Sequence, residues 1–179
     1  MVRNWRIEDA PSIAIYANNR KIWQNLRDGF PSPYTVQDAE TFISKANSAS
    51  PITVFAVATE FEAIGSIGLI MGSDVHRFTA EMGYFLAEPF WGRGIMTQVV
   101  KFLADWAIGD LGLHRVAAEP YATNMASHRV LEKAGFSYEG RLRSSALKDG
   151  KIVDQLVYSY LPKQSTDSSG RQTAGTPRL

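Results

Sequence analysis

The residues best suited to bind a charged ligand lie between Trp91 and Thr97, in the sequence Trp-Gly-Arg-Gly-Ile-Met-Thr. A strand-like run precedes this segment and a long amphipathic pattern follows it, so Gly92 and Gly94 stand at the predicted start of a helix. The first amides of a helix have no intrahelical partner and carry partial positive charge, and glycine lets an anionic group approach the backbone closely. The segment therefore predicts a site for phosphate or pyrophosphate.

Two common nucleotide motifs do not fit this segment. A nucleoside-triphosphate loop ends in Gly-Lys-Ser or Gly-Lys-Thr, whereas Gly94 is followed by Ile95. A dinucleotide fingerprint has a third glycine or alanine where Thr97 stands, and an acid about 20 positions further on, for which Glu119 is a late candidate. Glycines that serve only a tight turn are the structural alternative. A second predicted helix start, at Asn124, favours a ligand site, because one crossover unit brings both helix starts to neighbouring strand ends.

The composition predicts one globular domain. The chain has 179 residues, of which 45% are hydrophobic and 21% charged. A net charge of +1 with scattered basic residues argues against a nucleic-acid partner. The absence of cysteine excludes disulfides and thiolate metal sites, and the three histidines do not lie at metal-ligand spacing. Without a signal-peptide core or a run of roughly 20 apolar residues, we expect a cytoplasmic protein that needs no membrane.

The periodicity of the apolar residues predicts an α/β (α+β) domain over residues 1–162. Helices are expected over residues 10–18, 21–26, 36–46, 95–109 and 124–134. β-Strands are expected over residues 52–59, 63–71, 79–87, 115–119, 136–147 and 152–161. The first three strands are predicted to be antiparallel, the fourth to pair in parallel with the third, and the last two to form a hairpin. Residues 163–179 are rich in Ser, Thr, Gly and Gln and are predicted to be a disordered tail.

Local signals mark the ends of several of these elements. Asp9 is expected to cap the first helix, with Pro11 in its first turn. Thr35 and Asp38 resemble a capping box at the start of the third helix. Gly135 suits the left-handed position that ends the last helix. These signals predict where the elements begin and end.

Four segments carry a family resemblance, in the same order along the chain as in that family. They are residues 19–31 (NRKIWQNLRDGFP), 80–84 (AEMGY), 91–97 (WGRGIMT) and 124–136 (NMASHRVLEKAGF). Together they resemble the GCN5-related N-acetyltransferase (GNAT) superfamily, and within it the RimJ/RimL-like branch that acetylates ribosomal-protein N-termini and related amines. The resemblance covers about Arg3 to Pro162. It implies a mixed, mostly antiparallel sheet with one parallel pair splayed to admit coenzyme A, and helices on both faces.

The resemblance also implies a reaction. Acetyl-CoA is the expected cosubstrate, and its acetyl group would pass directly to a primary amine in a ternary complex, without a metal or a covalent enzyme. The amine belongs to a peptide or protein N-terminus or to a small molecule. A domain that keeps the coenzyme cleft but only senses acyl-CoA is the alternative. A monomer and a homodimer are both compatible with the sequence.

The coenzyme-binding residues are carried over from the family by position. The family loop reads Gln or Arg, two residues, Gly, one residue, then Gly or Ala; Pro89 occupies the first position here. The preceding strand end would pair its backbone with the pantetheine arm. Asn124 would form a hydrogen bond with the same arm, and the alternative is that it only caps the helix. Arg129 would reach a phosphate. The implied coenzyme-binding residues are Phe85, Leu86, Gly92, Arg93, Gly94, Ile95, Met96, Thr97, Asn124 and Arg129.

Acetyl transfer needs a group that takes a proton and a group that stabilises the thiolate. Amines are mostly protonated at neutral pH, and Glu81 is the expected general base, on the strand face that carries Phe85. An ion pair or a solvated edge is the alternative for this residue. Many superfamily members protonate the thiolate with a tyrosine where this chain has Leu131, so Ser127, one turn earlier, is the expected donor. His128 is expected at the surface.

The acceptor amine is expected against the first helices and the closing hairpin, across the sheet from the coenzyme. Trp23, Phe30 and Tyr34 are the predicted substrate-binding residues at its rim. Ordinary core packing is the alternative for each, because aromatic side chains at such spacing usually fill volume.

Overall fold

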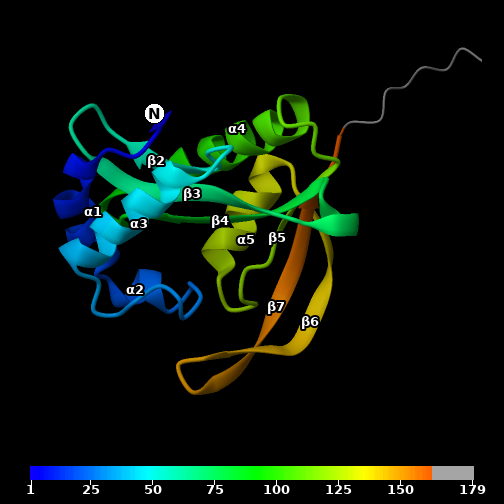
Figure 1. The fold of residues 1–179 in the computed structure, drawn as a ribbon. Helices are drawn as coiled ribbons and strands as arrows, with labels where there is room; N and C mark the ends of the chain where they lie inside the picture. Colours follow the sequence, from blue (N-terminus) through cyan, green and yellow to red (C-terminus); the bar gives the residue numbers. More distant parts are fainter. Residues whose placement is uncertain (163–179) are drawn as a thin grey trace, which may run out of the picture.

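Within residues 1–162, the part of the chain that the computed structural model describes, seven strands form one mixed sheet (Figure 1). The predicted tail, residues 163–179, lies outside the described residues. The strands are β1 (Val2–Arg3), β2 (Val54–Ala58), β3 (Ala63–Met71), β4 (Thr79–Leu86), β5 (Arg115–Ala118), β6 (Ser137–Lys148) and β7 (Lys151–Tyr160). The helices are α1 (Ala10–Ala17), α2 (Arg20–Trp23), α3 (Val36–Ser48), α4 (Ile95–Gly109) and α5 (Met125–Ala134). The short edge strand β1 was not predicted.

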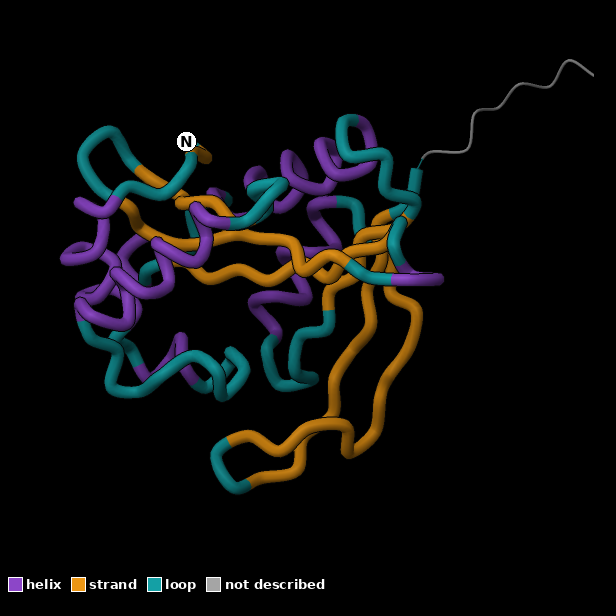
Figure 2. Tube along the Cα trace, in the orientation of Figure 1, coloured by secondary structure: helices purple, strands orange, loops and turns teal. Residues whose placement is uncertain are grey.

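The sheet splits between its two parallel strands. The strand order is β1-β2-β3-β4-β5-β7-β6, and β4 and β5 form its parallel pair. Thr79 to Glu81 of β4 pair with Arg115 to Ala117 of β5, but β4 continues to Leu86 after this pairing has ended. In Figure 2 the strands β2 to β4 cross the molecule while β6 and β7 turn away from them. This is the splayed mixed sheet that the family resemblance implies, and the prediction is confirmed.

Helices cover both faces of the sheet, as predicted. On one face, α4 and α5 pack through a buried cluster that includes Met82, Val100 and Leu131. On the other face, α1 and α3 pack through a second cluster that includes Ile43, and Phe85 lies against it. Successive residues of a strand point to opposite faces. Met82 and Phe85 of β4 therefore contact different helical layers.

Two predicted helix caps have different outcomes. Thr35 and Asp38 form the predicted capping box at the start of α3, where the Asp38 amide donates to the Thr35 hydroxyl over 3.2 Å. Asp9 stands at the predicted N-cap position of α1, but its side chain makes no capping hydrogen bond there. Its carboxylate accepts two hydrogen bonds of 2.7 Å from the Arg3 guanidinium and one of 2.9 Å from the Arg6 amide. Asp9 is buried, so its charge requires a cationic partner, and that requirement prevails over capping.

The hairpin of β6 and β7 ends in the predicted tight turn and reaches α2. Asp149 and Gly150 both have positive φ, 54° and 71°, as a type I′ turn requires. The Lys148 ammonium donates to the Asp28 carboxylate over 2.7 Å, and Arg20 of α2 forms an ion pair with Asp149. Figure 1 shows the hairpin projecting from the sheet below α2. The hairpin tip and α2 thus enclose the lower end of the molecule together.

Candidate active site

A cavity of about 920 Å³ lies where β4 and β5 part. Its wall includes residues of the α2 segment, β3, β4, the loop before α4, the β5–α5 loop and α5. A volume of this size lies in the range of small-molecule and cofactor sites. The predicted residues that line it are Phe30, Tyr34, Glu81, Phe85, Leu86, Gly92, Gly94, Ile95, Met96, Thr97, Asn124, Ser127 and Arg129. Arg93 and Trp23 lie outside this lining.

The glycine loop has the backbone geometry that an anion site needs. Gly92 and Gly94 have φ values of 75° and 73°, in the left-handed region that favours glycine. Gln98 donates to the Gly94 carbonyl oxygen over 3.3 Å, so the amides of Ile95, Met96 and Thr97 precede this helical bond. Such amides carry the partial positive charge of a helix start. The conformation suits a phosphate, and its use by coenzyme A stays a prediction.

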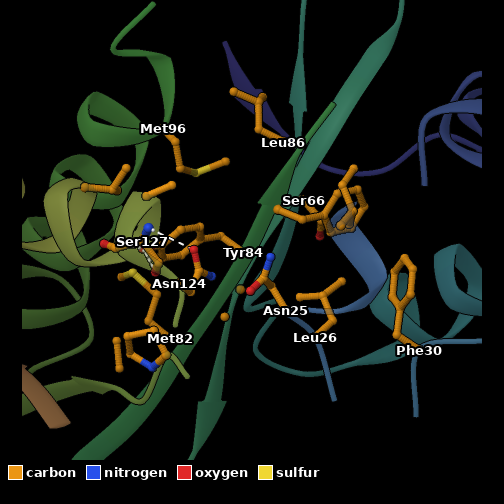
Figure 3. A pocket seen from close by; sticks show the side chains of 18 of the residues that line it. Asn25, Leu26, Phe30, Ser66, Met82, Tyr84, Leu86, Met96, Asn124 and Ser127 are labelled. Carbon is orange, nitrogen blue, oxygen red and sulfur yellow. Dashed lines mark hydrogen bonds between the residues drawn. The ribbon is translucent and has the colours of Figure 1, made fainter. Parts of the chain in front are cut away.

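The first turn of α5 presents a hydroxyl pair to the cavity. The Asn124 side chain accepts a 3.2 Å hydrogen bond from the Ser127 amide, so the predicted helix cap is confirmed. The Ser127 Oγ lies 2.7 Å from the Oη of Tyr84, which comes from β4 (Figure 3). Burial raises the pKa of Tyr84 above its ordinary value. The phenol therefore stays protonated at neutral pH.

Tyr84 is a site residue that the sequence analysis missed. It lies in the quoted segment 80–84, where a tyrosine in an apolar strand reads as core. The signal that identifies it is alternation along β4, because Tyr84 shares the face of Met82, which packs toward α4 and α5. In Figure 3, Met82, Asn124 and Ser127 lie on one side of β4, and Leu26 and Phe30 lie on the other.

The buried face of α5 corrects one prediction. His128 is 4% exposed, whereas it was expected at the surface. One of its ring nitrogens lies 3.1 Å from the Tyr121 carbonyl oxygen, and the ring stacks on Tyr158. His128, Leu131 and Ala134 are the buried residues of α5, at the three-residue spacing of one helix face. Leu131 is therefore part of the core and does not line the cavity.

Glu81 lies on the opposite face of β4 from Tyr84. Its carboxylate accepts a hydrogen bond from the Arg27 guanidinium, so the ion pair considered for this residue is present. This hydrogen bond raises the pKa of Arg27, which burial alone would lower. The Glu81 side chain is 31% exposed. The carboxylate is partly solvated and lies in the wall of the cavity.

Two of the three predicted aromatic residues line the cavity on the Glu81 side. Phe30 and Tyr34 stack with ring centroids 4.7 Å apart, and the rings of Phe30 and Phe85 form a T-shaped contact with centroids 5.5 Å apart. Burial raises the pKa of Tyr34 to about 12. Trp23 lies elsewhere, with the Lys148 ammonium 3.5 Å from its ring centroid. It contacts the hairpin tip, and this cation–π contact accounts for its position.

Two other kinds of site are absent from the described residues. Over residues 1–162, no group of three or more His, Asp or Glu side chains is placed to hold a metal ion. In the same part of the chain, no helix has the length and apolar character that a membrane crossing requires.

Comparisons with known proteins identify relatives along most of the chain. The model of the acetyltransferase (GNAT) domain family matches residues 1–137. The probable N-acetyltransferase YjcK of Bacillus subtilis is 38% identical over 104 residues, which cover 58% of each chain. The uncharacterized N-acetyltransferase p20 of Bacillus licheniformis is 27% identical over 91% of this chain and 93% of its own. The solved structure of Mycobacterium smegmatis RimJ in complex with CoA-disulfide has a TM-score of 0.79 at 22% identity, covering 92% and 83% of the two chains.

Proposed function

The chain belongs to the GNAT acetyltransferase family, and from this membership we propose that it transfers the acetyl group of acetyl-CoA to a primary amine. The observation that carries the proposal is the cavity at the split between β4 and β5, with the glycine loop of α4 in its wall. YjcK and p20 are both described as N-acetyltransferases, and the RimJ structure holds a coenzyme A derivative. The aligned segment spans little more than half of YjcK, so p20 supports the proposal along a greater length.

The coenzyme would bind along the open edge of β4 and against the start of α4. The pairing of β4 with β5 spans Thr79 to Glu81, so the edge beyond it, up to Leu86, can accept the extended pantetheine arm as a strand accepts a neighbour. The amides after Gly92 would hold the pyrophosphate. The side-chain oxygen of Asn124 caps α5, and its side-chain NH2 group would donate hydrogen bonds to the same arm.

The two chemical steps would use opposite faces of β4. Glu81 would take a proton from the amine, directly or through a water molecule, because a protonated amine has no lone pair for attack. Arg27 donates to its Oε1, which fixes the carboxylate and leaves Oε2 as an acceptor. Ser127 would donate a hydrogen bond to the departing thiolate from the other face. A thioester in the split would lie between these two groups.

A sensing module that binds acyl-CoA without turnover is the second candidate. The observation in its favour is Leu131, which is fully buried where many relatives in the superfamily use a tyrosine as the acid. Release of free thiol in the presence of an amine separates the two functions, because only the enzyme consumes acetyl-CoA.

The proposal is tested first by binding and then by turnover. At a hundred times its dissociation constant, acetyl-CoA should stabilise the fold by about 2.7 kcal/mol, or about 5–10 °C in Tm. Thiol release is then measured with peptide N-termini, polyamines and amino acids. The Glu81→Gln variant should lose about 10²- to 10⁴-fold in kcat and keep the acetyl-CoA shift.

The matched control is Glu40→Gln, which removes another partly buried carboxylate, on α3 and outside the cavity. It should keep wild-type kcat. No thermal shift with acetyl-CoA would reject the proposed function as a whole. Wild-type turnover by Glu81→Gln across pH 6 to 9 would reject only its role as the base.

A further inference from the structure

The Tyr84–Ser127 contact joins β4 to α5 across the split of the sheet. The two hydroxyl oxygens lie 2.7 Å apart, and both residues line the cavity. The Tyr84 hydroxyl also lies 3.4 Å from the Ser127 carbonyl oxygen. A distance of about 2.7 Å is the usual length of an O–H···O hydrogen bond, whereas 3.4 Å is long. The hydroxyl–hydroxyl bond is therefore the main interaction of this pair.

The direction of this hydrogen bond follows from acidity. A phenol is far more acidic than an alkyl alcohol, so Tyr84 is the better donor and the Ser127 oxygen the better acceptor. Burial raises the pKa of Tyr84, so its proton stays in place at neutral pH. With its oxygen accepting from Tyr84, Ser127 has its own hydroxyl hydrogen available for a third group. That group can lie in the cavity, which Ser127 lines.

We propose that Tyr84 is a positioning residue that holds the Ser127 hydroxyl so that it donates a hydrogen bond to the sulfur of departing coenzyme A. This inference rests on the proposed function. Leu131 is 0% exposed within the core, so that position of α5 offers no donor. The series of hydrogen bonds from Tyr84 through Ser127 to sulfur supplies a donor instead, and hydrogen bonds in such a series strengthen one another.

The step balances without a proton leaving Tyr84. The amine nitrogen forms the new bond to the acetyl carbon and gives up one proton to water, while the carbon–sulfur bond breaks and its electron pair passes to sulfur. Ser127 stabilises the developing thiolate by donation, and water then protonates the released thiolate. A preorganised donor of this kind contributes about 10²- to 10³-fold to kcat. Tyr84 contributes by fixing the donor and polarising its O–H bond.

The variant Tyr84→Phe removes the hydroxyl and keeps the ring that packs against the α4–α5 cluster. We expect its kcat to fall about tenfold, the equivalent of about 1.4 kcal/mol, while the KM for acetyl-CoA stays within about twofold. Ser127→Ala should fall about 10²- to 10³-fold. The double variant should be no slower than Ser127→Ala, because the two residues act as one unit. Ser127→Thr, which keeps a hydroxyl, should recover most of the activity.

The control Tyr158→Phe makes the same chemical change outside the cavity, where the hydroxyl donates to Glu132 over 3.2 Å. It should keep wild-type kcat. Because Tyr84 stays protonated, the ratio of wild-type to Tyr84→Phe kcat should be constant from pH 6 to 9.

Three results would overturn the inference: wild-type kcat in Tyr84→Phe, additive effects of Tyr84→Phe and Ser127→Ala, or a ratio that changes with pH. Each of them requires an active wild-type protein. A wild type that neither binds acetyl-CoA nor releases thiol would instead reject the proposed function, so the two failures are distinguishable.

Discussion

Replacing Gly94 with alanine separates a strained turn from a coenzyme site. Gly94 has a φ of 73°, and a Cβ built on it meets no atom within 4 Å. The cost of the substitution in the free protein is therefore the backbone term alone, about 1–2 kcal/mol for an L residue in the left-handed region. For a domain of this size, that corresponds to a fall of about 2–8 °C in Tm. The unliganded protein should stay folded.

The complex with acetyl-CoA should lose more free energy than the free protein, because Gly94 lines the cavity and a methyl group there would project into open space beside the loop amides. If the amides of this loop hold the pyrophosphate, the methyl group keeps the phosphates from the backbone. We expect the Kd for acetyl-CoA to rise at least tenfold, a loss of about 1.4 kcal/mol or more in binding free energy. Isothermal titration calorimetry with acetyl-CoA measures this change directly.

Gly112→Ala is the matched control. Gly112 has a φ of 66°, its Cβ would also meet nothing within 4 Å, and it does not line the cavity. It should lose the same stability as Gly94→Ala and keep the wild-type Kd. Equal affinities in the two variants would refute the assignment of the loop as the pyrophosphate site. A loss of affinity in both would point to a general effect of strain.

Two further predictions concern Asn124 and Glu139. Asn124→Ala should lose about 1 kcal/mol of stability with the helix cap, whereas Asn124→Asp keeps an acceptor for the Ser127 amide. If the side-chain amide of Asn124 donates a hydrogen bond to pantetheine, both variants should bind acetyl-CoA more weakly. Wild-type affinity of Asn124→Asp in calorimetry would contradict this role. The Arg115 guanidinium and then the Ser159 hydroxyl lower the pKa of Glu139 to about 2. Because this lies below the unfolded value of about 4.3, Glu139 stabilises the fold above that pH and loses the effect as pH falls toward 2. In urea unfolding, the stability advantage of wild type over Glu139→Gln should shrink between pH 4.5 and 2, and a constant difference would contradict the linkage.

The parts of the fold that the sequence predicts are those that neighbouring residues determine. Thr35 and Asp38 are three residues apart, and the turn at Asp149 and Gly150 depends on two adjacent positive φ values. The periodicity of the apolar residues likewise predicts α4 and the strands, because an element that buries one face carries apolar residues at the regular spacing of that face. These features are confirmed because no distant contact competes with them.

The features that the sequence analysis missed depend on contacts between distant segments. Tyr84 and Ser127 are 43 positions apart, and only the parallel pairing of β4 and β5 brings their hydroxyl groups together. The burial of His128 follows from its stacking on Tyr158 of β7, which a helical pattern alone does not reveal. Asp9 was assigned by a local rule, but the guanidinium of Arg3 competes for the same carboxylate. A buried charge is more costly than an uncapped amide, so the ion pair prevails.

The split in the sheet would let the proposed base, Glu81, and the proposed donor, Ser127, act on one acyl group from opposite faces of β4. Glu81 and Tyr84 are three positions apart on β4, so their side chains point to opposite faces, one toward Arg27 and the other toward Ser127. In a closed sheet, backbone hydrogen bonds would fill the plane between these faces. Because β5 pairs with β4 only as far as Glu81, an acyl group can lie in that plane beside the residues that follow. In the proposed mechanism an amine would then approach from the α1–α3 side and the sulfur would leave toward α5, so the base and the hydrogen-bond donor would not compete for one proton.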